Sequence, residues 1–245
     1  MRWVLPDLEA LSRAAAALFV RRARHAIARR GIFRVVLAGG QTPRGTYERL
    51  ARSPCREAVD WARVHVFWGD ERCVPLDDPR SNFRMAREAL LDHVPIPPEH
   101  LHPIRCEEGP TAAAARYEVE LRRFFGDGPP VFDLVFLGLG EDGHTASLFP
   151  FARALAEGER WVVEVMEADP PRVTMSAALL GGAERVVFLV AGAPKAAALR
   201  ATWAGPFDPW RWPAQRIRPG PGRLLWLVDA AAASFPDPVP GGDRT

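Results

Sequence analysis

The chain has 245 residues, enough for one large α/β domain or two small ones, and 48% of it is hydrophobic. Its formal net charge of +2 lacks the strongly basic balance of a nucleic-acid-binding protein, and no uncharged stretch approaches the ~20 residues that a membrane helix needs. Neither a nucleic acid nor a membrane is therefore expected as a partner.

The cysteines are Cys55, Cys73 and Cys106, and no C-x-x-C pair occurs among them. An odd number without that spacing favours a reduced, cytoplasmic protein over a secreted one held together by disulfides. The N-terminus agrees, because charged residues such as Arg2 and Asp7 interrupt any run of signal-peptide length.

Apolar periodicity predicts helices and strands that alternate along the chain. In chain order we expect a helix over 7–30, a strand over 34–38, a helix over 43–52, a strand over 63–68, helices over 83–91 and 111–125, a strand from Phe132 to Gly138, strands over 160–165, 172–176 and 185–191, a helix holding Lys195, a strand over 224–228 and a short helix from Ala230. The strand over 172–176 should pair near a sheet edge, and residues 203–222 should form an ordered loop over the core.

This alternation indicates an α/β fold with a mostly parallel sheet that is covered by helices on both faces. No linker or repeat divides the chain, so a single domain over residues 1–235 is expected. The tail over 236–245 begins with a cluster of proline and glycine and is expected to be flexible.

The stretch over 132–150, FDLVFLGLGEDGHTASLFP, joins an apolar run to a polar loop. Such a run is typical of a strand buried on both faces. Ligands of open α/β sheets bind beyond the carboxyl ends of these strands, which is where His144 lies. We interpret His144 as a catalytic candidate, against the alternative of a capping or core histidine.

A second candidate site is the strand-to-helix turn that follows the strand over 34–38. Thr42 is expected to cap the helix and Pro43 to lie in its first turn. Free N–H groups at a helix start favour an anion, so a phosphate site competes here with a tight turn that only caps the helix. The candidate phosphate loop is Gly39, Gly40, Gln41 and Thr42.

Charged residues also occur where other strands end. Asp70, Glu71 and Arg72 follow the strand over 63–68 and form either a substrate rim or a solvated turn. Lys195 is the only lysine among 32 basic residues. Codon bias explains the scarcity of lysine, but a compact ammonium group also suits a phosphate better than a guanidinium fork does.

Several separate segments resemble the 6-phosphogluconolactonases, within the superfamily that also contains glucosamine-6-phosphate deaminases. The resemblance spans nearly the whole chain, to about residue 234, and its most specific part is the D-G-H-T-A-S-L-F-P run. The segments are LAGGQTPRGTYERLA (37–51), VHVFWGDERCVPLDDPRSNFRMAREALLDHVPI (64–96), FDLVFLGLGEDGHTASLFP (132–150), RVTMSAALL (172–180), VVFLVAGAPKAAAL (186–199) and PAQRIRP (213–219).

The resemblance implies hydrolysis of 6-phosphogluconolactone to 6-phosphogluconate in the pentose phosphate pathway. It implies a cytoplasmic enzyme that uses no metal and no organic cofactor. The fold that it implies is a modified doubly wound, three-layer sandwich with a small extra β element beside the main sheet. The expected partner is a small sugar-phosphate lactone, and the protein should be a monomer or a homodimer.

Site residues are carried over only where this sequence matches the motifs. His144 matches the catalytic histidine, which takes a proton from the attacking water, and Asp142 would fix its tautomer or accept a sugar hydroxyl. The phosphate would be held by the loop over 39–42 together with Arg172 and Lys195.

Three further residues are implied with less definite roles. Arg72 would reach the phosphate or the carbonyl side of the sugar, and Asn82 would hold a hydroxyl or the loop itself. A purely structural role explains these two residues equally well. Asp70 matches the position at which the deaminases place a base, and its role in a lactonase is open.

Other functions are weighed against the lactonase. A deaminase or sugar-phosphate isomerase would carry a glutamate where Phe149 stands, and this disfavours both. A sugar-phosphate sensor of a transcription regulator would need a helix-turn-helix, for which the first 30 residues leave no room. A protein that binds the lactone without turnover remains open. Gln41 stands where a serine is common, which removes one hydroxyl from the phosphate loop.

Overall fold

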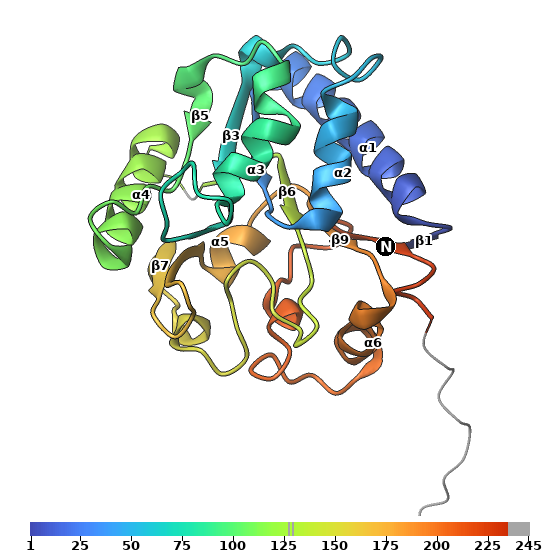
Figure 1. Ribbon diagram of the computed structural model, residues 1–245, viewed down its shortest axis with the longest axis vertical. Helices are drawn as coiled ribbons and strands as arrows, with labels where there is room; N and C mark the ends of the chain where they lie inside the picture. Colours follow the sequence, from blue (N-terminus) through green and yellow to red (C-terminus); the bar gives the residue numbers. More distant parts are fainter. Residues whose placement is uncertain (127, 129, 235–245) are drawn as a thin grey trace, which may run out of the picture.

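The computed structural model of the protein describes residues 1–126, 128 and 130–234. Its centre is a seven-stranded sheet in which all neighbouring strands are parallel (Figure 1). In sheet order the strands are β1 (Arg2–Leu5), β10 (Leu224–Asp229), β9 (Val186–Val190), β6 (Leu134–Leu137), β2 (Phe33–Leu37), β3 (Val64–Trp68) and β5 (Leu101–His102). The α/β fold with a mostly parallel sheet is confirmed.

A second, smaller sheet lies beside the first and is antiparallel throughout. Its order is β4 (Asp70–Arg72), β8 (Arg172–Met175) and β7 (Val162–Val165). The extra β element is therefore confirmed, but the expectation that 172–176 pairs near an edge is wrong, because β8 is the central strand. The error arises from β4, whose three charged residues carry no strand pattern of their own.

The helices surround the central sheet (Figure 1). They are α1 (Leu8–Arg30), α2 (Gln41–Leu50), α3 (Asn82–Ala89), α4 (Pro110–Phe125), α5 (Ala177–Gly181) and α6 (Ala196–Ala204). The limits of α1 follow from its caps: the Asp7 carboxylate accepts the amide of Ala10 at 2.7 Å, and Gly31 takes a left-handed conformation with φ of 73°.

Short 3-10 helices connect several of these elements. They are η1 (Trp61–Arg63), η2 (Leu91–His93), η3 (Pro98–His100), η4 (Arg153–Ala156), η5 (Ala193–Lys195) and η6 (Pro213–Arg216). Lys195 therefore lies at the junction of η5 and α6.

The core lies on both faces of the central sheet. Every residue of β6 and of β9 is buried, as expected for parallel strands covered on both sides. Helix α4 attaches the small sheet, since the Glu118 carboxylate accepts the amides of Trp161 and Val162 at 3.0 and 3.2 Å.

Several local expectations are wrong. Gly40, not Thr42, occupies the cap position of α2, so that Gln41 is its first residue. Residues 230–233 form turns instead of a helix, and the Asp229 carboxylate accepts the amide of Ala232 at 2.7 Å. The sequence pattern also missed β1, β4 and β5, which are short and lack a clear period. The proposed tail over 236–245 lies outside the described residues.

The cysteines differ from the expectation of reduced thiols. Cys73 and Cys106 form a disulfide across a sequence separation of 33 residues, and Cys55 is free. The bond joins the loop after β4 to the loop before α4, two segments whose proximity is set by the tertiary fold.

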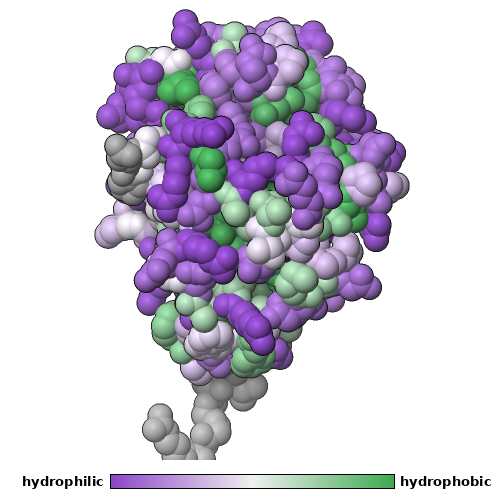
Figure 2. Space-filling view, turned by 90° about the vertical axis from the view of Figure 1, so that its left-hand side faces the viewer, coloured by the Kyte–Doolittle hydropathy of each residue, from purple (hydrophilic) through white to green (hydrophobic). Residues whose placement is uncertain are grey.

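The surface that carries α4 and β7 is mostly hydrophilic, with small scattered hydrophobic patches (Figure 2). Among the helices of the described residues, none is long and apolar enough to cross a membrane.

Candidate active site

The main candidate site is a cavity of about 420 Å³ beyond the carboxyl ends of three neighbouring strands, β9, β6 and β2. Each of these strands runs into a glycine-containing turn: 39–40 after β2, 138–140 after β6, and Gly192 after β9. Because parallel strands end at the same edge of a sheet, turns that are far apart in sequence meet around one space.

Ten of the eleven predicted site residues line this cavity. The exception is Asp142, which lines a neighbouring cavity of about 580 Å³ and contacts His144. The ten are Gly39, Gly40, Gln41, Thr42, Asp70, Arg72, Asn82, His144, Arg172 and Lys195. The structure thus brings the predicted residues together, while their individual roles remain predictions.

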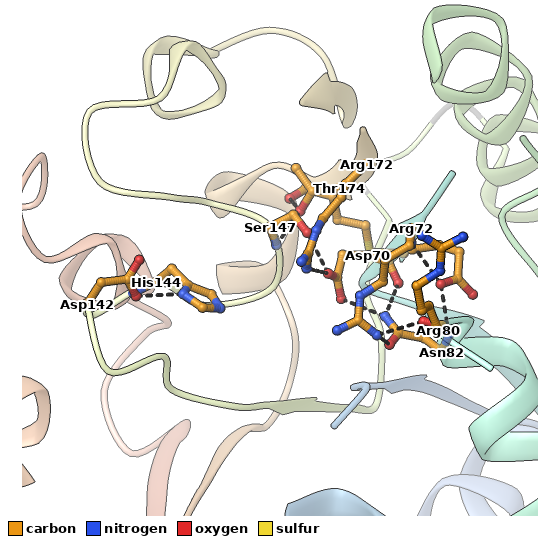
Figure 3. Close-up of polar contacts among 11 residues, drawn as sticks. Asp70, Arg72, Arg80, Asn82, Asp142, His144, Ser147, Arg172 and Thr174 are labelled. Carbon is orange, nitrogen blue, oxygen red and sulfur yellow. Dashed lines mark hydrogen bonds and ion pairs between the residues drawn. The ribbon is translucent and has the colours of Figure 1, made fainter. Parts of the chain in front are cut away.

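His144 lies in a turn that its own hydrogen bonds close. The amide of Gly140 donates to the carbonyl of His144 at 2.8 Å, and the Thr145 hydroxyl donates to the carbonyl of Gly138 at 2.8 Å. The ring nitrogen Nδ1 of His144 lies 2.6 Å from Oδ1 of Asp142, which also accepts the His144 amide at 3.1 Å. Figure 3 shows the far side of the ring pointing away from Asp142.

This pairing has a chemical consequence. Burial alone raises the pKa of Asp142, but the hydrogen bonds from the His144 ring and amide outweigh it, so that this pKa lies below its ordinary value. An ionised Asp142 holds the proton of His144 on Nδ1. The other nitrogen, Nε2, is then free to accept a proton.

Asp70 ties the His144 loop to the small sheet. It is only 7% exposed, and its Oδ2 accepts the Ser147 hydroxyl at 2.6 Å. The Asn82 amide group donates to the backbone carbonyl of Asp70 at 2.9 Å and to its carboxylate Oδ1 at 3.3 Å, and the Arg172 guanidinium lies 4.0 Å from the carboxylate. Asp70 is therefore a buried carboxylate with three partners, of which Ser147 was missed as a site residue.

Two arginines form the cationic side of the cavity. The antiparallel pairing of β4 with β8 places Arg72 directly opposite Arg172 (Figure 3). Arg72 donates to Oδ1 of Asn82 at 2.5 Å and to the carbonyl of Arg80 at 3.0 Å. Two guanidinium groups beside one space attract an anion, and their proximity depends on a pairing that crosses 100 residues of sequence.

Glu71 does not belong to the expected charged rim. Side chains of a strand alternate between its two sides, so Asp70 and Arg72 face the cavity while Glu71 points away from it. The Glu71 carboxylate accepts the amides of Asn82 and Phe83 at the start of α3, each at 2.8 Å. It thereby fixes the helix that presents Asn82 to the cavity.

The start of α2 and Lys195 also line the cavity. Gly39 has no room for a side chain, because a Cβ there would overlap the side chain of Asn82. The Lys195 ammonium lies 3.8 Å from the Glu141 carboxylate, which is two-thirds exposed. A helix start, an ammonium group and two guanidinium groups around one cavity suit a doubly charged phosphate.

The cavity is not the only place where polar groups meet. His102 lies in β5, where its ring is 3.1 Å from His65 and 2.7 Å from Glu120. Across the part of the chain that the structure describes, no group of histidine, cysteine or acidic side chains could hold a metal ion.

Comparisons with known proteins agree with the geometry. The family model of glucosamine-6-phosphate isomerases/6-phosphogluconolactonase matches residues 6–226. A 6-phosphogluconolactonase from Synechocystis sp. is 48% identical over 84% of this chain and 86% of the relative, and one from Nostoc sp. is 41% identical over 94% and 96%. The solved structure of 6-phosphogluconolactonase from Trypanosoma brucei is 32% identical and matches with a TM-score of 0.81, covering 95% of this chain and 97% of that one.

Proposed function

The chain belongs to the family of glucosamine-6-phosphate isomerases and 6-phosphogluconolactonases, and we propose that it is a lactone hydrolase with His144 as its general base. Its reaction is the hydrolysis of 6-phospho-D-glucono-1,5-lactone to 6-phosphogluconate in the pentose phosphate pathway. The proposal places the enzyme in the cytoplasm, as a monomer or a homodimer. The observation that carries it is the Asp142–His144 pair beside a cavity with cationic walls.

The chemistry needs one residue that first takes and then returns a proton. Nε2 of His144 takes a proton from water as the water oxygen forms its bond to the lactone carbonyl carbon. The bond from that carbon to the ring oxygen then breaks, and the imidazolium donates its proton to the departing oxygen. Asp142 stabilises the imidazolium and keeps the ring in the required tautomer. A lactone is an activated ester, so no metal or organic cofactor is required.

The phosphate would be held away from the reacting carbon. The N–H groups at the start of α2, the Lys195 ammonium and the Arg172 guanidinium provide backbone donors and two positive charges. Arg72 and Asn82, which are joined by a hydrogen bond, would then contact the sugar. In this arrangement Asp70 acts by holding Ser147 and Asn82 in place.

The deaminase alternative lacks a group that it needs. Phe149 stands where the resemblance places the glutamate that assists ring opening, and its ring centroid lies 4.6 Å from that of His144. The Arg172 guanidinium lies over the Phe149 ring, with its Cζ 5.2 Å from the ring centroid. An aromatic residue cannot relay a proton to an amine, whereas hydrolysis of a lactone has no such step.

The test is the rate of hydrolysis of freshly generated 6-phosphogluconolactone, read through coupled 6-phosphogluconate dehydrogenase and corrected for spontaneous opening. Loss of a general base is expected to lower kcat by roughly 10²- to 10⁴-fold in His144→Ala. His25→Ala, which replaces an exposed histidine of α1, is the matched control and should keep full activity. An undiminished rate in His144→Ala would move the base elsewhere, and a wild type that does not accelerate hydrolysis would leave only a binding protein.

A further inference from the structure

The segment over 208–215, which we call the support segment, packs behind the loop that carries His144. None of its residues lines the main cavity, whereas Arg211 lines the neighbouring cavity together with Asp142 and Arg172. Two backbone hydrogen bonds join it to the loop region: the amide of Ala214 donates to the carbonyl of Gly143 at 3.1 Å, and the amide of Phe151 donates to the carbonyl of Trp210 at 3.0 Å. The loop that carries His144 is therefore attached to the support segment through its backbone.

The tightest contact of the support segment is made at Gly143, the residue between Asp142 and His144. A Cβ on Gly143 would lie 2.5 Å from Cε3 of the Trp212 indole, so the ring lies directly against the glycine backbone. Gly143 has a φ of 85°, a conformation that glycine adopts easily and also leaves easily. The indole and the Ala214 amide together restrict this flexible link.

The support segment is itself firmly held. Its Gln215 side chain accepts the amide of Asp208 at 2.7 Å and donates to the carbonyls of Ala201 and Pro206, each at 3.1 Å. The amide of Trp212 donates to the carbonyl of Asp208 at 2.8 Å. Trp212 is thus fixed relative to α6, a helix that starts directly after Lys195.

From these contacts we propose that Trp212 is a positioning residue for the Asp142–His144 pair. Its indole supports the Gly143 peptide and so sets the orientation of the imidazole towards the cavity. The inference rests on the proposed function, because positioning affects turnover only if this pair performs the reaction. Catalytic groups need such supporting contacts, since a shift of about 1 Å can cost roughly 100-fold in rate.

The proposal predicts which kinetic constant changes. The groups assigned to the phosphate lie on α2, on β8 and at the start of α6, whereas the Trp212 indole lies against Gly143 in the loop that carries His144. Substrate affinity should therefore survive the loss of the indole while the chemical step slows. A general loss of folded protein would instead lower the amount of active enzyme and leave both constants of the remaining enzyme unchanged.

The kinetic experiment compares Trp212→Ala with Trp210→Ala. Trp210 belongs to the same segment, but its side chain is 42% exposed and stacks on Arg216, while its contact with the loop uses the backbone carbonyl. We expect Trp212→Ala to lower kcat by roughly 10- to 100-fold with KM changed less than about threefold. Trp210→Ala should match the wild type, and Trp212→Phe, which keeps a six-membered ring, should recover most of the activity.

A second measurement does not depend on turnover. Hydrogen exchange followed by mass spectrometry should show that the amides of residues 143–148 exchange at least about tenfold faster in Trp212→Ala than in Trp210→Ala. If Trp212→Ala does not fold, Trp212→Leu supplies the same kinetic and exchange comparisons. Equal kcat and equal exchange in the Trp212 and Trp210 variants would overturn the proposal, as would a loss confined to KM. If the wild type lacked lactonase activity, the proposed function would fail, while the exchange result would still decide whether Trp212 orders the loop.

Discussion

Replacement of Lys195 by alanine removes the only lysine of the chain from the cavity wall. The ammonium lies 3.8 Å from Glu141, and solvent reaches the pair, because the Glu141 side chain is 66% exposed and that of Lys195 is 27% exposed. Exposed ion pairs contribute about 0–1 kcal/mol to stability, so the variant should fold normally. Any large effect on catalysis should then come from the missing contact with the substrate phosphate.

The size of that effect follows from the type of contact. A hydrogen bond to a charged group contributes about 1.5–3 kcal/mol, and each 1.4 kcal/mol changes an equilibrium constant about tenfold. If Lys195 binds the phosphate equally in the ground state and the transition state, KM should rise roughly 10- to 150-fold with kcat nearly unchanged. The KM of Lys195→Arg should lie between that of the wild type and that of Lys195→Ala, because a planar guanidinium group fits a site for a compact cation poorly.

The assay should use two substrates. With 6-phosphogluconolactone, Lys195→Ala should show the increase in KM; with unphosphorylated glucono-1,5-lactone, its kcat/KM should equal that of the wild type. Glu141→Gln is the matched control, since it removes the partner of the ammonium and keeps the ammonium itself. A KM that stays unchanged for the phosphorylated lactone, or one that rises equally for both substrates, would refute the assignment of Lys195 to the phosphate.

Two further predictions concern stability. Burial raises the pKa of Glu71 from 4.5 to about 7, against the opposing effect of three backbone amides, so the folded protein holds this proton more tightly than the unfolded chain does. The tighter proton binding by Glu71 therefore stabilises the folded state. This stabilisation is fully present below about pH 4.5 and is lost as the pH rises through 7, which lowers the free energy of unfolding by about 3 kcal/mol. Denaturant titrations should show a flatter pH dependence in Glu71→Gln, and an unchanged slope would contradict the reasoning. The Cys73–Cys106 disulfide spans 33 residues, so reduction should lower the free energy of unfolding by about 3–4 kcal/mol in the chain-entropy account. Thermal unfolding with and without reductant measures this loss; Cys73→Ser should be insensitive to reductant, and an equally insensitive wild type would speak against the bond.

Local sequence patterns were enough to predict part of the site. The turns after β2, β6 and β9 were expected at the carboxyl ends of strands, and the cavity lies at these turns. His144 and the loop over 39–42 could be singled out because each directly follows a buried apolar run, a signal that a few neighbouring residues contain. Thr42 was misassigned as a cap because Gly40 takes the cap position with a φ of 95°.

By itself, the sequence determined the alternation of strands and helices, the parallel sheet and the edge at which the candidate residues gather. These features depend on period and on adjacency along the chain, so a short stretch of residues is enough to specify them. Only the tertiary structure decided that Arg72 faces Arg172, that Glu71 turns away to hold α3, that Cys73 meets Cys106, and that Trp212 lies against Gly143. Each of these contacts joins segments that no local pattern relates, because they form only when distant parts of the chain pack together.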